Sequence, residues 1–178
     1  MAQFVSFDPN VKVRGKILLA YIAALGESAR PLLEKHGFAS VQPDAWYLLQ
    51  SILDVFKEIY EKDFTAMLDL VHIGMEVPKH VLWPPEIQTI EDALFSIDEA
   101  YHMNHKDGEI GTYRTSQAKR REFQIFCENP YPCDFDYGLL YGIARRYLPP
   151  DGHLIVEHDP DAPCRKHGED SCTYSVRW

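Results

Sequence analysis

Three cysteines near the C-terminus are the residues best suited to metal chemistry. Cys133 stands at the start of an expected helix, and Cys164 and Cys172 flank a short polar loop that contains Gly168. A helix N-terminus favours a thiolate through its N–H groups and dipole, and a loop between two strands can bring two thiolates to one ion. With a fourth ligand, three sulfurs would complete a closed tetrahedral zinc site of the structural type.

The identity of the fourth ligand is open on the pattern alone. His158 ends the strand that leads into the loop, and we favour it because imidazole suits zinc. Asp161, three residues before Cys164, is the competitor, and Glu157 is a weaker third choice. The spacing is not a standard zinc signature, so buried free thiols and a disulfide between Cys164 and Cys172 are the alternatives.

The same segment carries a resemblance to a known family. The residues that carry it are Cys133, Gly138, Gly142, Cys164 and Cys172. This pattern resembles the 4-vinyl reductase domain, which occurs in bacteriochlorophyll-related proteins and in bacterial activators that detect phenols and toluenes. The resemblance is best from about Tyr101 to Trp178. It implies zinc at the three cysteines and places Asp161 where the aromatic sensors have a Glu ligand, although the preceding loop looks longer here.

The hydrophobic pattern predicts an α+β fold in a single domain, 1–178. Helical spacing dominates about 11–106, and strand-like patterns dominate the sheet-and-zinc part, about 107–178. We expect helices over 11–35, from Pro43, over 65–77, after an N-cap at Thr89 and over 134–147. We expect strands at 109–115, 122–128, 154–158 and 172–178, forming one antiparallel sheet with helices on one face. The glycines at 138 and 142 share a helix face and indicate close packing.

Aromatic residues make up 12% of the chain, which suits a protein that lines a cavity as well as fills a core. The resembled domain is similar in fold to haem nitric-oxide-binding domains and to vesicle-tethering subunits of the TRAPP type, which share an apolar cavity between helices and sheet. The candidates to line such a cavity here are Trp46, Phe56, Tyr60, Trp83, Phe95, Tyr101, His105 and Phe123. Plain core packing is the alternative for each of them.

His105 makes haem a second candidate for the ligand. It follows Ile97 and Tyr101 on the apolar face of an expected helix, where a histidine can bind haem iron. The haem nitric-oxide-binding family also holds the haem propionates with a Tyr-x-Ser-x-Arg motif. The run from Tyr174 to Arg177 is one residue too short and lies in the last expected strand, so it is not that motif. A polar group at a helix end is the alternative for His105.

Charge and composition exclude several classes of function. The net charge of -9 would be repelled by a nucleic-acid backbone and by anionic lipid. No apolar run approaches the roughly 18 residues of a membrane span, and Met1–Asn10 does not read as a signal peptide, so we expect a cytoplasmic protein. A Gly-rich nucleotide loop and a convincing nucleophile–base pair are missing, so we lean away from an enzyme.

The sequence therefore predicts a small-molecule-binding sensory domain with a structural zinc site and an apolar cavity for a hydrophobic or aromatic ligand. The first alternative is a haem-binding gas or redox sensor that uses a helix histidine. The second is an accessory protein of tetrapyrrole reduction or an assembly scaffold. The resemblance implies a homodimer formed through helices. The chain ends directly after the last expected strand, so a sensor of this kind would signal through an effector protein in trans.

Overall fold

The computed structural model describes residues 3–62 and 65–178, so Met1 and Ala2 of the N-terminal segment lie outside the described residues. The helices are α1 (Lys16–Leu25), η1 (Gly26–Ser28), α2 (Ala29–Lys35), α3 (Leu49–Lys62), α4 (Ala66–His80), α5 (Ile90–Phe95), α6 (Ile97–Asn104), α7 (Cys133–Arg146) and η2 (Arg165–His167). The strands are β1 (Lys12–Arg14), β2 (Trp46–Leu48), β3 (His105–Lys106), β4 (Thr112–Lys119), β5 (Glu122–Glu128), β6 (Ile155–His158) and β7 (Cys172–Arg177).

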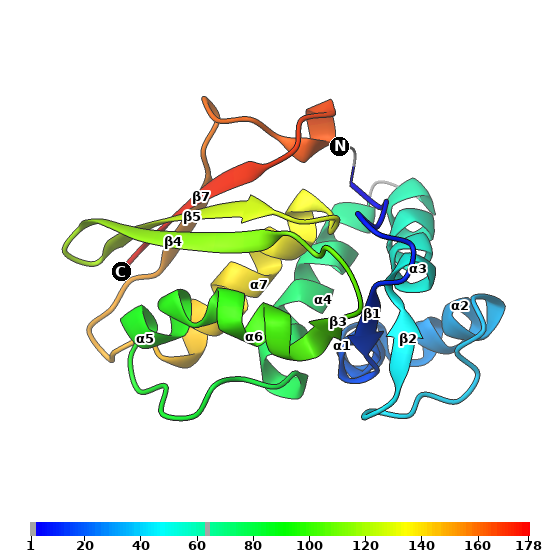
Figure 1. Cartoon of the computed structure of the whole chain (residues 1–178). Coiled ribbons are helices and arrows are strands. Elements are labelled where there is room, and N and C mark those ends of the chain that lie inside the picture. Colours follow the sequence, from blue (N-terminus) through cyan, green and yellow to red (C-terminus); the bar gives the residue numbers. More distant parts are fainter. Residues whose placement is uncertain (1–2, 63–64) are drawn as a thin grey trace.

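The C-terminal half contains the four-stranded antiparallel sheet that the alternation predicts. Its strand order is β4-β5-β7-β6, so the α+β prediction is confirmed. Buried residues of β5 and β7 lie opposite one another, with Ile125 against Tyr174 and Cys127 against Cys172. These side chains form one apolar face, and α7 packs against it (Figure 1). None of the described helices is long and apolar enough to cross a membrane.

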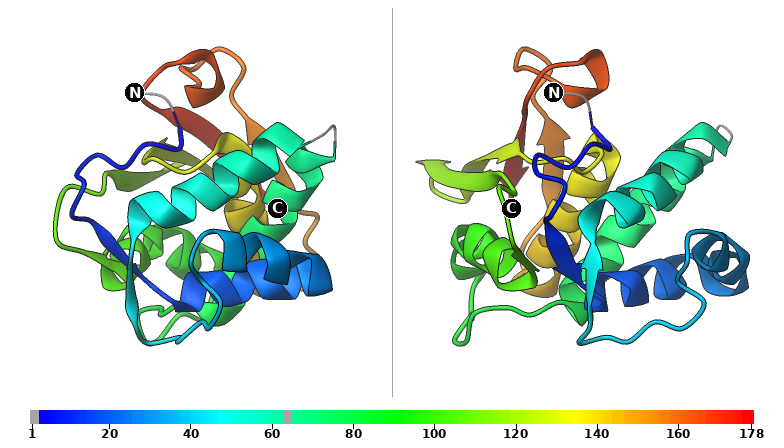
Figure 2. Two further views of the ribbon diagram at one scale, coloured as in Figure 1. Left: turned by 90° about the vertical axis from the view of Figure 1, so that its right-hand side faces the viewer. Right: turned by 45° about the vertical axis from the view of Figure 1, so that its right-hand side comes forward.

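Helix α7 lies between the sheet and α4, and glycines allow it to approach α4 very closely (Figure 2). A Cβ atom on Gly138 would lie 2.1 Å from the carbonyl oxygen of Val71, and one on Gly142 would lie 2.7 Å from that of Met75. The close packing predicted for the two glycines is confirmed, and its partner is a helix. Gly74 of α4 contributes from the other side, since its Cβ would lie 2.2 Å from the carbonyl oxygen of Phe135.

The N-terminal half differs from the prediction because it contains a second, three-stranded sheet of order β2-β1-β3. The helix expected over 11–35 begins only at Lys16 and is interrupted at Gly26, where φ is 59°. The helix expected from Pro43 begins at Leu49. Strands of two or three residues are too short to show an alternating pattern, so backbone pairing overrides the helical periodicity here.

The helices that lead to the sheet follow the prediction in part. Thr89 is the expected N-cap and forms a capping box with Asp92. The helix that follows breaks at Ser96 into α5 and α6. His105 lies just past the end of α6 and begins β3, so the expectation of a histidine within a helix is wrong. Helix α4 also continues through Pro78, where the expected helix ended.

The crossing of α4 and α7 can be tested with Gly138→Ala. The added Cβ has no space beside backbone atoms, so the two helices must separate and the free energy of unfolding should fall by about 3 kcal/mol. Chemical denaturation monitored by circular dichroism measures this. Gly37→Ala is the control, because that residue has open space around it and only a left-handed backbone (φ 86°), which costs about 1 kcal/mol. Equal losses for the two variants would contradict the packing role.

Candidate metal centre and interior cavity

The structure brings together the ligand atoms of Cys133, His158, Cys164 and Cys172, which all lie within 4.8 Å of one another. They come from four places in the fold: the first turn of α7, the end of β6, the residue before η2 and the start of β7. The Cys133 sulfur is 3.7 Å from that of Cys164 and 3.1 Å from that of Cys172. Two thiolates on one tetrahedral zinc lie about 3.8 Å apart, so the sulfurs are close to metal-binding geometry.

The fourth position is occupied by His158. Its Nε2 atom is buried and has no hydrogen-bond partner, so the lone pair is available to an ion. Asp161 is exposed and lies outside the group of four. Cys127 faces Cys172 across the sheet but is also outside the group, and its thiol lies 3.9 Å from a backbone carbonyl oxygen. It is a buried free thiol on the second strand of the hairpin, as expected.

The cluster favours one thiolate before any ion binds. The hydrogen bond from the Cys133 thiol lowers the pKa of Cys172, and the nearby guanidinium of Arg165 lowers it further. The same hydrogen bond to Cys172, together with burial, raises the pKa of Cys133. Because thiolates are the form that binds metals, Cys172 would be the first ligand of an ion, and Cys133 would have to lose its proton to bind it.

Two charged residues that the sequence analysis did not single out lie beneath the cluster. The Arg165 and Asp136 side chains form an ion pair and are both fully buried. Burial raises the pKa of Asp136, although Arg165 opposes this shift. Burial also disfavours the charge of Arg165, but the facing Asp136 outweighs it and raises the pKa of Arg165. Breaking such a pair would leave a lone charge in the interior, which is strongly destabilising.

An interior cavity lies among α1, α4, α6 and α7, and Tyr113 is the residue of the four-stranded sheet that reaches it. Of the aromatic candidates, Trp83, Tyr101 and His105 line it. Its other lining residues are Val13, Ile17, Val77, Val81, Ile97, Ala100, Asn104, Tyr113, Tyr131, Phe135 and Leu139. The volume is about 40 Å³. That is more than the roughly 15 Å³ that one water needs and far below the roughly 300 Å³ of a site for a drug-sized ligand.

The structure places the remaining aromatic candidates elsewhere. Tyr60 and Phe95 are on the surface, with 42% and 55% of their area exposed. Phe56 is in the main core, and Phe123 lies at the far end of the sheet beneath Phe95. The Trp46 ring is half-buried and packs against two cationic side chains. Aromatic content alone therefore does not identify the residues around a cavity.

His105 is held in one protonation state and one orientation. Its Nδ1 atom is 2.7 Å from the carbonyl oxygen of Tyr101, and its Nε2 atom is 2.7 Å from the hydroxyl of Tyr131. Burial lowers the pKa of His105 to about 4, so the ring is neutral at pH 7. Because a carbonyl only accepts, Nδ1 carries the proton and Nε2 accepts a hydrogen bond from Tyr131 at the cavity wall.

Tyr131 is a residue of this cavity that the sequence analysis missed. The signal that could have found it is the spacing of Tyr131, Cys133 and Phe135, which is that of the Tyr-x-Ser-x-Arg motif. Only the tyrosine of the motif is present. Cys133 belongs to the cysteine cluster instead, and Phe135 contributes an uncharged ring to the cavity.

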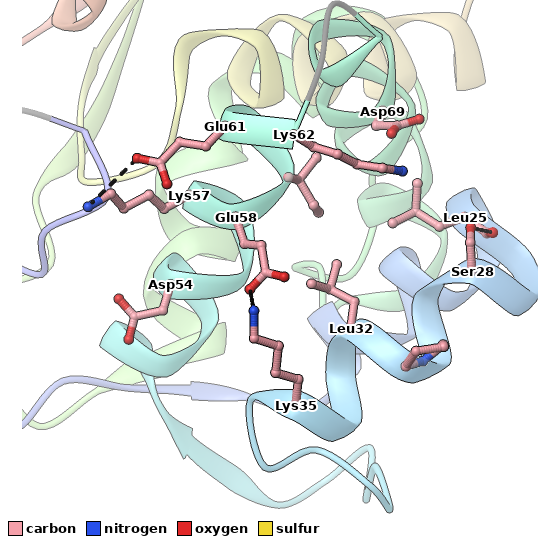
Figure 3. Close-up of a pocket in the computed structure, with 12 residues that line it drawn as sticks. Leu25, Ser28, Leu32, Lys35, Asp54, Lys57, Glu58, Glu61, Lys62 and Asp69 are labelled. Atoms are coloured by element: carbon pink, nitrogen blue, oxygen red, sulfur yellow. Dashed lines mark hydrogen bonds and ion pairs between the residues drawn. The ribbon is translucent and has the colours of Figure 1, made fainter.

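A larger groove of about 760 Å³ lies on the surface between α2 and α3. Figure 3 shows charged side chains from both helices facing one another across it. Lys35 pairs with Glu58 at 2.8 Å, and Lys57 lies 3.9 Å from Glu61. The described residues that line this groove include none of the predicted site residues, and the pairing of its charges is typical of a solvated surface.

Comparison with known proteins shows the fold. No protein-family model matches the chain, and no curated protein matches it. An H-NOX protein from S. oneidensis in the Fe(II) ligation state is 16% identical, with a TM-score of 0.68 over 92% of this chain and 95% of its own. The S. oneidensis H-NOX protein in the Fe(II)NO state is 15% identical, with a TM-score of 0.67 over 92% of this chain and 98% of its own.

A third solved structure, from work on haem distortion in the H-NOX family, is 13% identical, with a TM-score of 0.64 over 93% of this chain and 94% of its own. The chain therefore has the fold of H-NOX domains, which bind haem and nitric oxide. This agrees with the fold that the resemblance in the sequence implies. The narrower resemblance to the 4-vinyl reductase domain rests on the cysteine and glycine pattern alone.

The protonation state of His105 predicts a pH dependence of stability. Its pKa is about 4 when folded and 6.5 in its ordinary state, so below pH 6.5 the unfolded chain binds the additional proton. Stability should therefore fall as the pH drops from 6.5 to 4, by about 1.4 kcal/mol per pH unit. His105→Gln removes this group, so the difference between wild type and variant in denaturant titrations should change with that slope. Parallel pH profiles would show that His105 titrates normally.

Proposed function

We propose that this chain is a sensory domain that receives a small ligand in the cavity beside His105 and carries a structural zinc ion at the cysteine cluster. The observation that supports it most strongly is His105 itself. Its neutral imidazole is fixed by the carbonyl of Tyr101 and by the hydroxyl of Tyr131, which donates to Nε2, and both His105 and Tyr131 line the cavity. A buried imidazole–hydroxyl pair of this kind is suited to orient a ligand that enters an otherwise apolar cavity.

The donor set of the cluster fits zinc. Cys133, Cys164 and Cys172 supply thiolates, and His158 supplies a buried imidazole nitrogen without another partner. Four protein ligands leave no open position, so the ion would have a structural role and would join α7, β6 and β7. Each ligand lies at an end of its element or in a loop, and the metal would therefore hold the edge of the sheet against the helix.

The zinc proposal predicts the behaviour of Cys172→Ser. Wild-type protein purified without a metal-affinity tag should contain one zinc per chain, and the variant should contain none. The free energy of unfolding should fall by about 3 kcal/mol or more, because metal binding contributes to folding. Metal analysis and thermal unfolding measure the two effects.

Cys127→Ser is the matched control for this experiment. It changes a buried thiol directly opposite on the neighbouring strand, outside the cluster. It should keep the zinc, even if the buried hydroxyl lowers stability. Wild-type protein without zinc, or full stability of Cys172→Ser, would be incompatible with a structural zinc ion.

The structural neighbours favour haem as the group that this cavity binds, and haem-based gas sensing is therefore the second candidate function. His105 is the residue that would hold the haem iron, since its Nδ1–H is held by a carbonyl and the residue lines the cavity. The rest of the site does not fit haem as folded. The volume is about 40 Å³, and no lysine or arginine is among the described lining residues to pair with propionates. Tyr131 and Phe135 would have to move aside.

Haem titration separates the two candidates. We expect wild-type protein to show no stoichiometric Soret band with haemin, because the folded cavity is too small for a porphyrin. Xenon under pressure, as a probe of a few-atom ligand, should instead shift the NMR signals of His105 and Trp83. A stoichiometric Soret band that is lost in His105→Ala would overturn the small-ligand proposal in favour of haem. A band that persists in His105→Ala would indicate non-specific haem uptake.

A sensory domain signals through contact with another protein, and the resemblance implies a homodimer formed through helices. The N-terminal half of α4 exposes Met67 and Leu68, with 51% and 62% of their area accessible, beside the groove over the metal centre. We assign this surface to a second copy of the chain, since that dimer would use helices. A hydrophobic or aromatic ligand that is larger than the cavity could bind only if the cavity opened, and the same holds for haem.

A further inference from the structure

The cysteine cluster and the cavity are joined by a continuous set of buried polar contacts. On the metal side, the backbone nitrogen of Arg165 and its side-chain Nε both lie 3.4 Å from the sulfur of Cys172. Both groups donate, so the sulfur of Cys172 receives two hydrogen bonds from one residue. The position of this sulfur therefore fixes the Nε end of the guanidinium group.

The other end of the guanidinium group reaches two residues. Nη2 donates to Asp136, and Nη1 donates to the side-chain oxygen of Asn129 at 2.5 Å. All of these groups are buried, so no water is available to replace a contact that is lost. Arg165 is a rigid planar fork, and a shift at one end is passed to the other.

Each of the two contacts continues to a wall of the cavity. Asp136 accepts a hydrogen bond from the hydroxyl of Tyr113 at 2.6 Å, and the side chain of Asn129 accepts one from the backbone N–H of Tyr131 at 2.9 Å. Tyr113 and Tyr131 both line the cavity, and Tyr131 donates to His105. Two short paths thus run from the metal ligand Cys172 to the cavity.

We propose that Arg165 is a positioning residue that couples the metal centre to the ligand cavity. It orients the Cys172 sulfur for the ion, and it holds Tyr113 and Tyr131 in place through Asp136 and Asn129. Binding at one site therefore changes affinity at the other, because both sites require the same arrangement of one buried guanidinium group. The inference rests on the proposed function, since it uses both the zinc site and the cavity.

The test is the zinc affinity of variants at the cavity, measured by competition with a chromogenic chelator. Tyr113→Phe removes only the hydroxyl that binds Asp136, and it should weaken zinc binding by about 10-fold, the lower end of effects from groups behind metal ligands. Tyr101→Phe is the matched control. Its hydroxyl is also buried at the cavity but donates to the carbonyl oxygen of Ile110, away from this path. Its zinc affinity should be that of the wild type.

A second pair of variants tests the metal side. Arg165→Lys keeps the charge and loses the planar fork, so it should weaken zinc binding by about 10- to 100-fold. The control is Arg177→Lys, the same change at a partly exposed arginine of β7 that pairs with Glu157 on the surface. If Arg165→Lys does not fold, the tyrosine pair decides alone. Equal zinc affinities of folded Tyr113→Phe and Tyr101→Phe would overturn the coupling.

The outcome also separates this inference from the proposed zinc site. If wild-type protein binds no zinc, the zinc proposal fails. The coupling is then tested by changing the Cys172 sulfur and observing His105 at the cavity. Cys172→Ser should shift the imidazole ¹⁵N resonances of His105, whereas Ser175→Ala, on the other face of the same strand, should leave them unchanged. Unchanged resonances in Cys172→Ser would overturn the coupling, whatever the metal content.

Discussion

The close approach of α4 and α7 is the constraint on which the rest of this molecule depends. Backbone lies against backbone at Gly74, Gly138 and Gly142, which leaves α7 one position and one rotation relative to α4. That rotation directs Cys133 toward the loop before β7, Phe135 toward the cavity and Asp136 toward the interior below the cluster. Three different tasks are therefore set by the placement of the first turn of a single helix.

The two sites differ in how the protein treats polar groups. At the cluster, charged and ionisable groups lie close together at the end of the sheet. Sulfur atoms from separate elements meet there, and a buried ion pair lies beside them. At the cavity, charge is avoided: the imidazole of His105 is kept neutral by burial, and its hydrogen-bond partners are a backbone carbonyl and one tyrosine hydroxyl. In the proposed function, the cluster would hold a zinc ion permanently. The cavity would bind and release a small uncharged molecule.

The sequence predicted those parts of the structure that depend on local pattern. The four-stranded sheet, the N-cap at Thr89 and the paired glycines each have a signature within a few residues. The fold also brings together the three cysteines of the pattern and His158, which was favoured for its chemistry and not for its spacing. The short strands of the second sheet have no such signature. Arg165 could not be recognised, because its neighbours, Lys166 and His167, read as a solvated loop. Its burial follows only from long-range packing against Asp136.

The place of β7 in the sheet has a consequence for how the chain folds. This strand pairs with β5 on one side and β6 on the other, yet both of these precede it in the sequence. During synthesis the β4–β5 hairpin is made before β7, so the outer edge of β5 stays unpaired. β6 likewise has no neighbour in this sheet until β7 has been synthesised. Contacts between residues so distant in sequence form slowly. The nascent chain thus passes through a stage with an open sheet edge, which is the interval in which it is most prone to aggregate.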